Sequence, residues 1–304
     1  MSLDAGRLRV LVEVAHAGSI AAAAQRMSFT PSALSQQLAK LERELGCRLV
    51  DRGPGGTTLT KAGRVLVSHG EAVLGELRAA EEAVRAVLGA EPDRLAIGTF
   101  STAGRILVPE ALAAFRHDYP AARLSLLDLE PPKGYGLVTS RDLDLLITHR
   151  YVGVPLPGLA GLRRTRLLTD PLRLVLPADH PAADQARSGL ADLADEEWIS
   201  GGHGVPNRVC LGTLAKQAGV EPHVAYETQD YEVTLALIRA GLGISLVPES
   251  VLRRTDLTGL AVRELRGVRP SRQMYVVHRR RPAALVAAMV TLLLRSAETI
   301  TTAV

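Results

Sequence analysis

The polar side chains of residues 31–45 have the types and spacing of a helix that contacts double-stranded DNA. Four leucines recur at helical spacing and make one apolar stripe, namely Leu34, Leu38, Leu41 and Leu45. At about 100° per residue, Ser32 and Gln36 fall nearly opposite that stripe. A recognition helix contacts base edges mainly from its N-terminal part, so we expect Ser32 and Gln36 to reach the bases.

Three further residues of this helix can contact the DNA backbone. We expect Ser35, Lys40 and Arg43 to touch phosphates or neighbouring bases, because hydroxyl and cationic groups commonly bind phosphate oxygens. Alone, the pattern is also that of an amphipathic helix with a solvated polar face. The alanine-rich segment before it and the local excess of positive charge favour DNA binding over that alternative.

The preceding residues predict how this helix is held. Apolar residues at helical spacing predict a first helix over Ala5–Ala17. Ser19 can cap a second helix, Ile20–Met27, whose small alanines let a neighbouring helix approach closely, as a helix-turn-helix requires. Thr30 and Pro31 then start the third helix as its N-cap and first helical residue.

Residues 49–59 predict a strand, a loop and a second strand. The strands Leu49–Arg52 and Thr57–Leu59 flank a glycine-rich run at 53–56, and together they make a small wing. Arg52 stands at the base of this wing, where it could lie along the DNA backbone or the minor groove.

The positive charge of the chain is concentrated at its N-terminal end. Residues 1–65 hold nine Lys or Arg against five Asp or Glu, whereas the remaining residues hold 27 of each. This distribution suits a phosphate-binding module on a neutral body. Charge alone does not exclude a chance distribution.

The stretch from Leu8 to Gly63 resembles the winged helix-turn-helix of LysR-type transcriptional regulators. The matching residues are AGS at 17–19, Ala23-Ala24, TPSALSQQL at 30–38, LERELG at 41–46, Arg52 and LTKAG at 59–63. The resemblance implies DNA contacts by Thr30, Pro31, Ser32, Ser35, Gln36, Gln37, Lys40, Arg43 and Arg52. Val50 stands where the family often has Phe, which is a packing change. Pro31-Ser32 stands where many members have Gln-Pro, so the operator sequence does not carry over.

A long helix is predicted from Thr60 to about Leu88. Its apolar residues approximate the three-four spacing of a coiled-coil seam, and they are Leu66, Val73, Leu77, Ala80, Val84 and Val87. We expect a partner helix to cover this seam, and in LysR-type proteins the linker helix pairs two subunits. The alternative is that the stripe packs on the chain's own body.

After this helix, Gly89–Pro92 predicts a hinge, and the remaining chain alternates strands and helices in the pattern of an α/β domain. We expect strands at Leu95–Phe100, Arg123–Leu127, Asp142–Thr148, Arg173–Pro177, Trp198–Ser200, His223–Tyr226, Gly243–Val247 and Met274–His278. We expect helices at Ile106–His117, Arg208–Gln217, Tyr231–Ala240 and from about Pro282 to Ser296.

The resemblance extends more loosely over the whole chain, and GLGISLVPES at 241–250 is its clearest late match. It implies a mainly α winged helix-turn-helix (1–60), a linker and dimerisation helix (61–89), and an α/β two-lobed, periplasmic-binding-protein-like (type 2) effector domain (90–304). Lobe one would comprise about 93–162 and 268–304, and lobe two about 163–267, because the last strand and helix cross back to lobe one.

Polar residues at strand ends are the candidates for binding a small molecule. Ser101 and Thr102 lie between a strand and a helix, so their hydroxyl and N–H groups can hold a polar ligand group. By the resemblance, the cleft between the lobes is also lined by Thr148, His149, Gly201, His203, Thr228, Gln229 and Pro248. Plain N-capping, or satisfaction of backbone groups by strand-end side chains, is the alternative for each of them.

The sequence shows no residue set suited to catalysis, metal binding or a cofactor. The spacing of a nucleophile elbow is absent at residues 98–104, and no phosphate-binding glycine motif follows a strand. The eight histidines are scattered, with no close pair at helical spacing for zinc. Cys210 opens a predicted helix, where a thiol can be reactive, although inert packing is the commoner state.

The compartment follows from cysteine use and apolar runs. Cys47 and Cys210 form no metal-ligand pattern, which suits a reducing environment. No run of about 18 apolar residues is present, and the N-terminal residues lack the apolar core of a signal peptide. We therefore expect a cytoplasmic protein without membrane contact.

These features together predict a sequence-specific transcription regulator under the control of a small-molecule effector. Its partners would be double-stranded DNA, an unidentified effector and a second copy of the chain, with a tetramer and RNA polymerase as further candidates. Two alternatives stay open, an architectural DNA-binding protein without an effector and, less favoured, a two-lobed ligand-binding enzyme. A competition assay against random DNA separates the first alternative from the main prediction.

Overall fold

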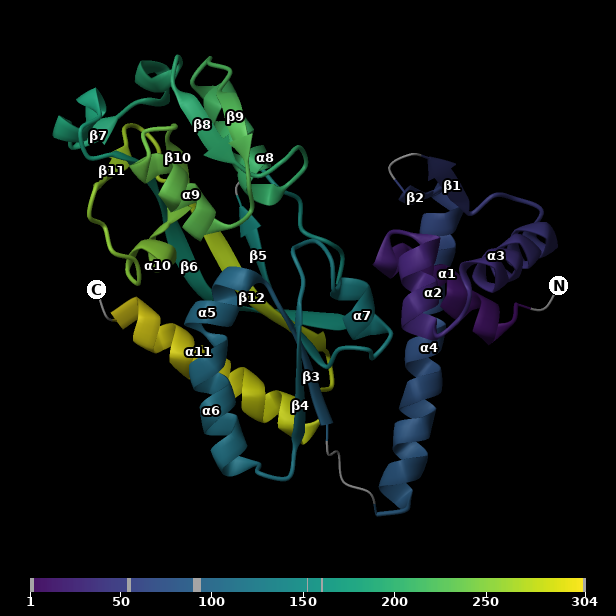
Figure 1. Ribbon diagram of the computed structural model, residues 1–304. Coiled ribbons are helices and arrows are strands. Elements are labelled where there is room, and N and C mark those ends of the chain that lie inside the picture. The colour runs from purple at the N-terminus through teal and green to yellow at the C-terminus, as the bar shows by residue number, and fades with distance from the viewer. Residues whose placement is uncertain (1–2, 54–55, 90–93, 152, 160, 303–304) are drawn as a thin grey trace.

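The computed structural model describes residues 3–53, 56–89, 94–151, 153–159 and 161–302 of the 304-residue chain. A small helical unit lies beside a larger α/β domain, and the long helix α4 (Lys61–Val87) leads from one toward the other (Figure 1). The expected hinge at Gly89–Pro92 falls mostly on residues outside the described ranges, as does the middle of the wing loop.

The N-terminal unit is the predicted winged helix-turn-helix. It consists of α1 (Ala5–Ala17), α2 (Ile20–Met27), α3 (Pro31–Leu45), β1 (Val50–Gly53) and β2 (Gly56–Leu59). The three helices have the predicted bounds because each begins at a local capping side chain, provided by Asp4, Ser19 and Thr30. Their buried faces meet in one aliphatic core, to which Val67 and Leu74 of α4 contribute.

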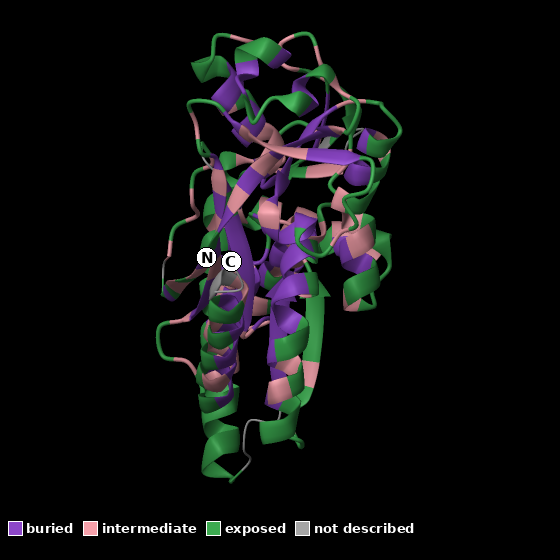
Figure 2. Cartoon of the chain, turned by 90° about the vertical axis from the view of Figure 1, so that its left-hand side faces the viewer, coloured by how far each residue is buried: buried purple, intermediate pink, exposed green. Residues whose placement is uncertain are grey.

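The first turns of α4 belong to this unit, whereas its later turns are largely exposed. The N-cap is Thr60, whose hydroxyl accepts the Gly63 N–H, and the C-cap is Leu88, so the predicted helix is confirmed. Most residues after Gly75 are exposed, as Figure 2 shows for the end of α4. They include the large apolar side chains Leu77 and Val84, which are 49% and 61% exposed.

Lobe one of the α/β domain begins with three strands and three helices. Its elements are β3 (Arg94–Thr99), α5 (Ser101–Ile106), α6 (Val108–Asp118), β4 (Arg123–Asp128), α7 (Tyr135–Thr139) and β5 (Leu145–Tyr151). The predicted helix Ile106–His117 corresponds to α6, which begins at Val108, whereas the preceding helix α5 was not predicted and is separated from α6 at Leu107. Pro109 has no backbone N–H to continue the α5 ladder, and it starts α6 instead.

Lobe two follows, and the chain then returns to lobe one. Its elements are β6 (Leu162–Pro177), two 3₁₀ helices (Pro181–Asp184 and Leu190–Leu193), β7 (Arg187–Ser188), β8 (Glu197–Ser200), α8 (Pro206–Gln217), β9 (His223–Glu227), α9 (Tyr231–Arg239), β10 (Ser245–Pro248), α10 (Glu249–Leu252) and β11 (Leu260–Leu265). The return elements are β12 (Ser271–Arg279) and α11 (Ala284–Thr302).

One curled sheet joins the two lobes. Its strand order is β4-β3-β5-β12-β6-β11-β7, and β10 also pairs with β6. The long strand β6 pairs with β12 over its first half and with β10 and β11 over its second half. The expected lobe boundary after residue 162 therefore falls at the start of β6, and the lobes share this strand as a common spine.

Strand alternation separates two cores in lobe one. Leu145 and Ile147 of β5 face the core under α5, α6 and α11, whereas Leu146 between them faces the core under α7. The same alternation continues to the end of β5, so that Thr148 and His149 lie on opposite faces of the sheet. Thr148 therefore lies toward α7, and His149 lies toward the space between the lobes.

Candidate nucleic-acid interface and ligand pocket

Helix α3 presents a polar face on the side away from its buried leucines. Thr30 Oγ1 accepts the Ala33 N–H at 3.2 Å, which fixes the first turn. Leu34, Leu38 and Leu41 are completely buried. The predicted DNA-contacting residues of α3 are exposed except for Ser35, which is half-buried, and the exposed ones are Pro31, Ser32, Gln36, Gln37, Lys40 and Arg43. The face predicted from sequence is therefore a free surface of this chain.

The carboxylate of Glu42 fixes the position of α3 relative to the wing. Its Oε1 accepts the backbone N–H groups of Leu49 and Val50 at 2.8 and 3.2 Å. A half-buried carboxylate that accepts two backbone N–H groups resists rotation of α3 against β1. The polar face and the wing therefore move as one body.

A second contact holds the wing against the turn between α1 and α2. The Thr57 N–H donates to the Gly18 carbonyl oxygen at 3.2 Å. A Cβ at Gly56 would lie 3.1 Å from the same oxygen, so glycine permits this approach. Arg52 pairs with Thr57 in the hairpin register, but its side chain lies outside the described part of the structure.

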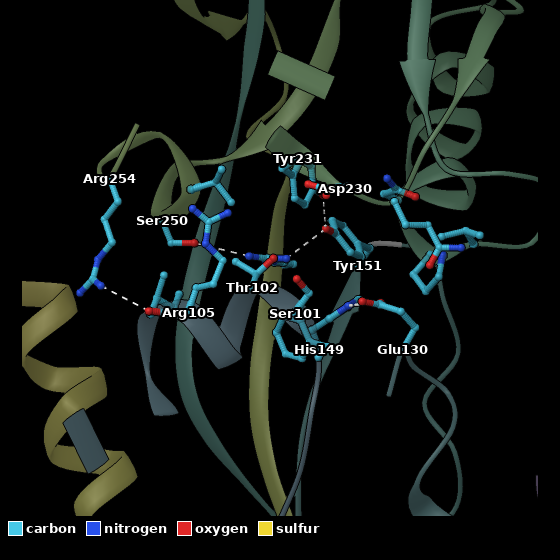
Figure 3. A pocket seen from close by; sticks show the side chains of 18 residues that line it. Ser101, Thr102, Arg105, Glu130, His149, Tyr151, Asp230, Tyr231, Ser250 and Arg254 are labelled. Carbon is cyan, nitrogen blue, oxygen red and sulfur yellow. Dashed lines mark hydrogen bonds and ion pairs between the residues drawn. The ribbon is translucent and has the colours of Figure 1, made fainter. Parts of the chain in front are cut away.

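A pocket lies between the two lobes, where α5 faces the first turns of α8, α9 and α10 (Figure 3). It encloses about 680 Å³, including the part open to solvent. At its mouth, Arg105 donates to Glu232 at 2.7 Å, which links α5 to α9 across the lobes. The lining residues are Phe100, Ser101, Thr102, Arg105, Ile106, Glu130, His149, Tyr151, Val205, Pro206, Asn207, Gln229, Asp230, Tyr231, Ser250, Val251, Arg254 and Arg272.

Arg272 provides a buried positive charge in the pocket wall. Its guanidinium lies 2.9 Å from Asp170 Oδ2, and Ser250 donates to the same carboxylate from its hydroxyl at 2.6 Å. Burial lowers the pKa of Arg272, but Tyr151 and Asp170 raise it above its ordinary value, so the side chain stays charged. Among the described residues, its Nη1 makes a single long hydrogen bond, of 3.4 Å, to the Tyr151 hydroxyl. That nitrogen can therefore donate to a ligand.

Two tyrosine hydroxyls beside Arg272 share a single hydrogen bond. The hydroxyls of Tyr151 and Tyr231 lie 2.9 Å apart, and either one can be the donor. Burial raises the pKa of both phenols, so both keep their hydrogen. Two hydroxyl hydrogens and one bond leave one hydrogen without an acceptor among the described residues. A ligand oxygen in the pocket can accept it.

His149 is a buried, neutral imidazole in the same wall. Burial lowers its pKa, and this effect exceeds the opposite influence of Glu130. Its Nε2 lies 3.7 Å from Glu130 Oε2, which is longer than a hydrogen bond, and its Nδ1 has no partner among the described residues. The ring is held edge-to-face by Phe100 and Tyr151, at centroid distances of 4.4 and 5.1 Å. Both ring nitrogens are thus held in fixed positions without a hydrogen-bond partner among the described residues.

The pocket brings together four of the residues expected from sequence to contact an effector. These are Ser101 and Thr102 from the start of α5, His149 from β5 and Gln229 from the loop before α9. They come from both lobes, as a cleft between lobes requires. The hydroxyl groups of Ser101 and Thr102 add two more donors to those of the tyrosine pair.

The other five expected residues do not line this pocket. Thr148 faces the opposite side of β5, beside the phenol of Tyr135. Gly201 packs against Val205 and Asn207, where a Cβ would meet the Asn207 amide oxygen at 2.4 Å.

The remaining three are held by local structure. His203 is exposed in the loop before α8, and the Thr228 hydroxyl accepts the Asp230 N–H at 3.1 Å in a turn. Pro248 is the N-cap residue of α10 and pairs with Leu172 of β6. Contact of these five residues with an effector stays a prediction.

Several lining residues carried no signal in the sequence. Arg272 and Tyr151 lie on strands whose ends meet only in the folded sheet, and Asp170, the ion-pair partner of Arg272, is 102 residues from it in the sequence. Tyr231 is the first residue of α9, where an aromatic residue reads as an ordinary apolar position. Glu130 follows β4, and its strand-end position was the one usable hint.

Neither metal chemistry nor membrane insertion gains support from the described residues. Nowhere among them do three His, Cys, Asp or Glu side chains come together as a metal site would require. Over the same ranges, no helix has the length and apolarity needed to cross a membrane. Cys210 is buried and Cys47 is exposed.

Comparison with known families gives two matches that together cover nearly the whole chain. Residues 6–64 match the family described as bacterial regulatory helix-turn-helix protein, lysR family. Residues 89–298 match the LysR substrate binding domain. The chain is 32% identical to the transcriptional regulator CbbR of Xanthobacter flavus, over 90% of this chain and 81% of the relative. It is 28% identical to the transcriptional dual regulator GltC of Bacillus subtilis, over 83% of each chain.

Solved structures share the fold over the full length. A full-length OxyR variant from Pseudomonas aeruginosa superimposes with a TM-score of 0.62 at 22% identity, over 98% of this chain and 95% of that one. Full-length CbnR, solved in complex with its target DNA, gives a TM-score of 0.55 at 24% identity, over 97% of this chain and all of that one. The order of a winged unit, a long helix and a two-lobed domain is thus common to all three.

Proposed function

Because this chain belongs to the LysR family of bacterial transcriptional regulators, we propose that it recognises operator DNA through α3 and responds to a small acidic molecule bound between its lobes. Like its relatives CbbR and GltC, which are transcriptional regulators, it is a DNA-binding regulator with an effector domain. It is not an enzyme. The observation that carries the proposal is that one chain combines an exposed polar face on α3 with an interlobe pocket lined by unsatisfied hydrogen-bond donors.

The DNA contacts divide into two kinds. Ser32 and Gln36 lie near the start of α3, so they contact base edges in the major groove, with Thr30 and Pro31 close to the backbone. Ser35, Gln37, Lys40 and Arg43 position the helix, and Arg52 contacts the backbone or minor groove beside it. The exposure of the α3 residues supports their access to DNA.

The chain works as three parts. Residues 1–60 bind DNA, residues 61–89 pair two subunits, and residues 90–304 bind the effector. The exposed apolar side chains along α4 support pairing with a second copy, among them Val73, Leu77, Val84 and Val87. Pairs of such dimers form a tetramer, and RNA polymerase is a further candidate partner. A bacterial DNA-binding regulator works where the chromosome is, so the protein is cytoplasmic.

The pocket favours a ligand rich in oxygen acceptors. Its donors are Arg272 Nη1, one hydroxyl hydrogen of the Tyr151–Tyr231 pair, and the hydroxyls of Ser101 and Thr102, and Glu130 adds one carboxylate beside His149. A carboxylate satisfies two or more of these donors at once, and charge-assisted hydrogen bonds are roughly twice as strong as neutral ones. The effector is therefore a small organic acid.

Two experiments test this function. Footprinting across the protein's own promoter and neighbouring genes, in competition with random DNA, should show a protected site that random DNA does not compete away. Equal competition by random DNA would instead favour the architectural alternative. A thermal-shift screen of the full chain should select carboxylic acids over their amides, and a hit that does not need the carboxylate would refute the acidic ligand class.

A further inference from the structure

Helix α4 has two different faces that lie nearly opposite each other. Its exposed apolar side chains at 73, 77, 80, 84 and 87 follow one helical stripe. A second stripe is formed by Glu71, Gly75, Arg78 and Glu82, and at about 100° per residue it is turned about half a circle from the first. The helix can therefore pair with a second copy on one face and hold a different element on the other.

The second stripe holds the chain's own α/β domain at α7 and the turn after it. Arg78 donates to the Ser140 carbonyl oxygen at 2.5 Å and pairs with Asp142 at 2.6 Å. One turn further along, Glu82 pairs with Arg141 at 2.5 Å. The Ser140 hydroxyl donates to Asp142 at 2.6 Å, which orients the carboxylate for Arg78.

Two glycines let the two elements approach closely. A Cβ at Gly75 would lie 2.3 Å from the Thr139 carbonyl oxygen, and a Cβ at Gly136 would lie 1.8 Å from Glu71 Oε1. A larger residue at Gly75 would push α4 and α7 apart, whereas one at Gly136 would displace the Glu71 carboxylate. Together with the ion pairs, these residues (Glu71, Gly75, Arg78 and Glu82 with Gly136 and 139–142) form what we call the α4–α7 clasp.

The clasp reaches the DNA-binding unit directly. Glu71 Oε1 lies 2.8 Å from His16 Nε2 at the end of α1, and both side chains are mostly buried. One carboxylate thus touches α1 of the DNA-binding unit through His16 and α7 of the effector domain through Gly136. A shift of α7 along α4 changes the surroundings of both contacts.

The other end of α7 reaches the pocket between the lobes. Glu130 lines the pocket beside His149, and Tyr135 begins α7 only five residues later. The intervening turn is tight, since the Lys133 N–H donates to the Glu130 carbonyl oxygen and a Cβ at Gly134 would lie 2.7 Å from Leu146. A second path runs through β5, where His149 faces the pocket and its neighbour Thr148 lies beside Tyr135.

We propose that the α4–α7 clasp is the contact through which occupancy of the interlobe pocket changes how tightly the effector domain packs against its own linker helix, α4. This inference rests on the proposed regulatory function and adds the route of regulation to it. An occupant that displaces Glu130 or β5 has different affinities for the closed and open clasp, which is the condition for a population shift. By linkage, opening the clasp changes the pocket to the same extent.

The test is hydrogen-exchange mass spectrometry of the full-length protein, without DNA or effector. Arg78→Ala and Asp142→Ala should each speed amide exchange in residues 71–82 and 135–142 by about tenfold, because local opening governs exchange. Arg85→Ala is the matched control, since Arg85 is an exposed arginine on the same helix and is not one of the residues that form the clasp. Exchange in α2 reports whether a variant is folded.

The pocket arm uses Ser101→Phe and Gln229→Phe, which fill the pocket from lobe one and from lobe two. Each should change exchange in residues 71–82 by about threefold or more, and neither should do so when combined with Arg78→Ala. Unchanged exchange in residues 71–82 in both filled variants, with α2 protected, would overturn the proposal. Because no DNA is present, that result would leave the proposed regulator function standing.

Discussion

The guanidinium of Arg272 and the carboxylate of Asp170 lie 2.9 Å apart and are 1% and 2% exposed, at the point where β12 and β6 pair between the lobes. Removing one member of such a pair leaves the other charged and buried. Arg272→Ala should therefore lower the free energy of unfolding by about 3–5 kcal/mol.

Urea denaturation of the full chain, followed by tryptophan fluorescence, measures this effect, since Trp198 is buried in lobe two. Arg254→Ala is the matched control, because Arg254 lines the same pocket but is exposed. The double variant Arg272→Met/Asp170→Leu should recover most of the lost stability, since it leaves no unpaired charge. Equal midpoints for Arg272→Ala and Arg254→Ala would contradict the assignment.

His149 should make the stability of the effector domain depend on pH. Burial lowers its pKa below the ordinary 6.5, so the unfolded chain takes up a proton at a pH where the folded chain does not. The stability it contributes is present above about pH 6.5 and is lost as the pH falls from there toward the folded pKa. The urea midpoint of the native chain should fall more steeply between pH 7.5 and 5.5, taken as roughly that titration window, than that of His149→Gln. Parallel pH profiles would exclude this role for His149.

Two glycines inside helices should respond in opposite ways to replacement by alanine. A Cβ at Gly63 in α4 would lie 2.0 Å from the Leu49 carbonyl oxygen, whereas a Cβ at Gly212 in α8 meets nothing within 4 Å. Gly212→Ala should stabilise the protein by up to about 1 kcal/mol through helix propensity. Gly63→Ala should lower the urea midpoint of unfolding instead, because the backbone at Leu49, just before the wing, and α4 must move apart. Stabilisation by both substitutions would show that the contact at Gly63 is loose.

The N-terminal unit could be predicted from sequence because its signals are local. Thr30 and Pro31 start α3 and Gly46 ends it, all within the residues that fold together. Thr60 caps α4 in the same way. The open alternative for α4, pairing with a second copy or packing on the chain's own body, is not a simple choice. The two opposite faces leave room for both, since Arg78 and Gly75 contact α7 while Leu77 stays exposed.

The spine strand and the pocket wall could not be predicted, because their determinants are distant in sequence. The sequence predicts only the last part of β6, because Arg163, Arg164 and Arg166 obscure the alternation of polar and apolar residues in its first half. In the structure, the backbone of that first half is hydrogen-bonded to β12. Helix α7 is five residues long and has no side-chain cap. Arg272 reads as a surface arginine until Asp170 is brought to it by the sheet.

The division of DNA contacts predicts different outcomes for two neighbouring substitutions on α3. Gln36→Ala removes a base contact, so it should reduce discrimination between the operator and mismatched sites by about 1–3 kcal/mol. Lys40→Ala removes a phosphate contact, so it should weaken binding to all sites alike and reduce the slope of log K against log salt by about 1. Quantitative footprinting at several salt concentrations measures both quantities. Identical behaviour of the two variants would refute the division.

Pairing through α4 predicts that a charge on its apolar face separates the subunits. Leu77 and Val84 are 49% and 61% exposed in one chain, and both lie on the stripe opposite the clasp. Leu77→Glu or Val84→Glu places two like charges in a closely packed seam, so sedimentation velocity should show monomers at concentrations where the native chain is paired.

Glu81→Gln is the matched control for pairing, because Glu81 is exposed on the same helix but lies outside that stripe. Loss of pairing should also lower operator affinity by about 10²-fold or more, since two linked readers gain from effective concentration. A dimer that survives both substitutions on the apolar stripe would move the subunit interface away from α4.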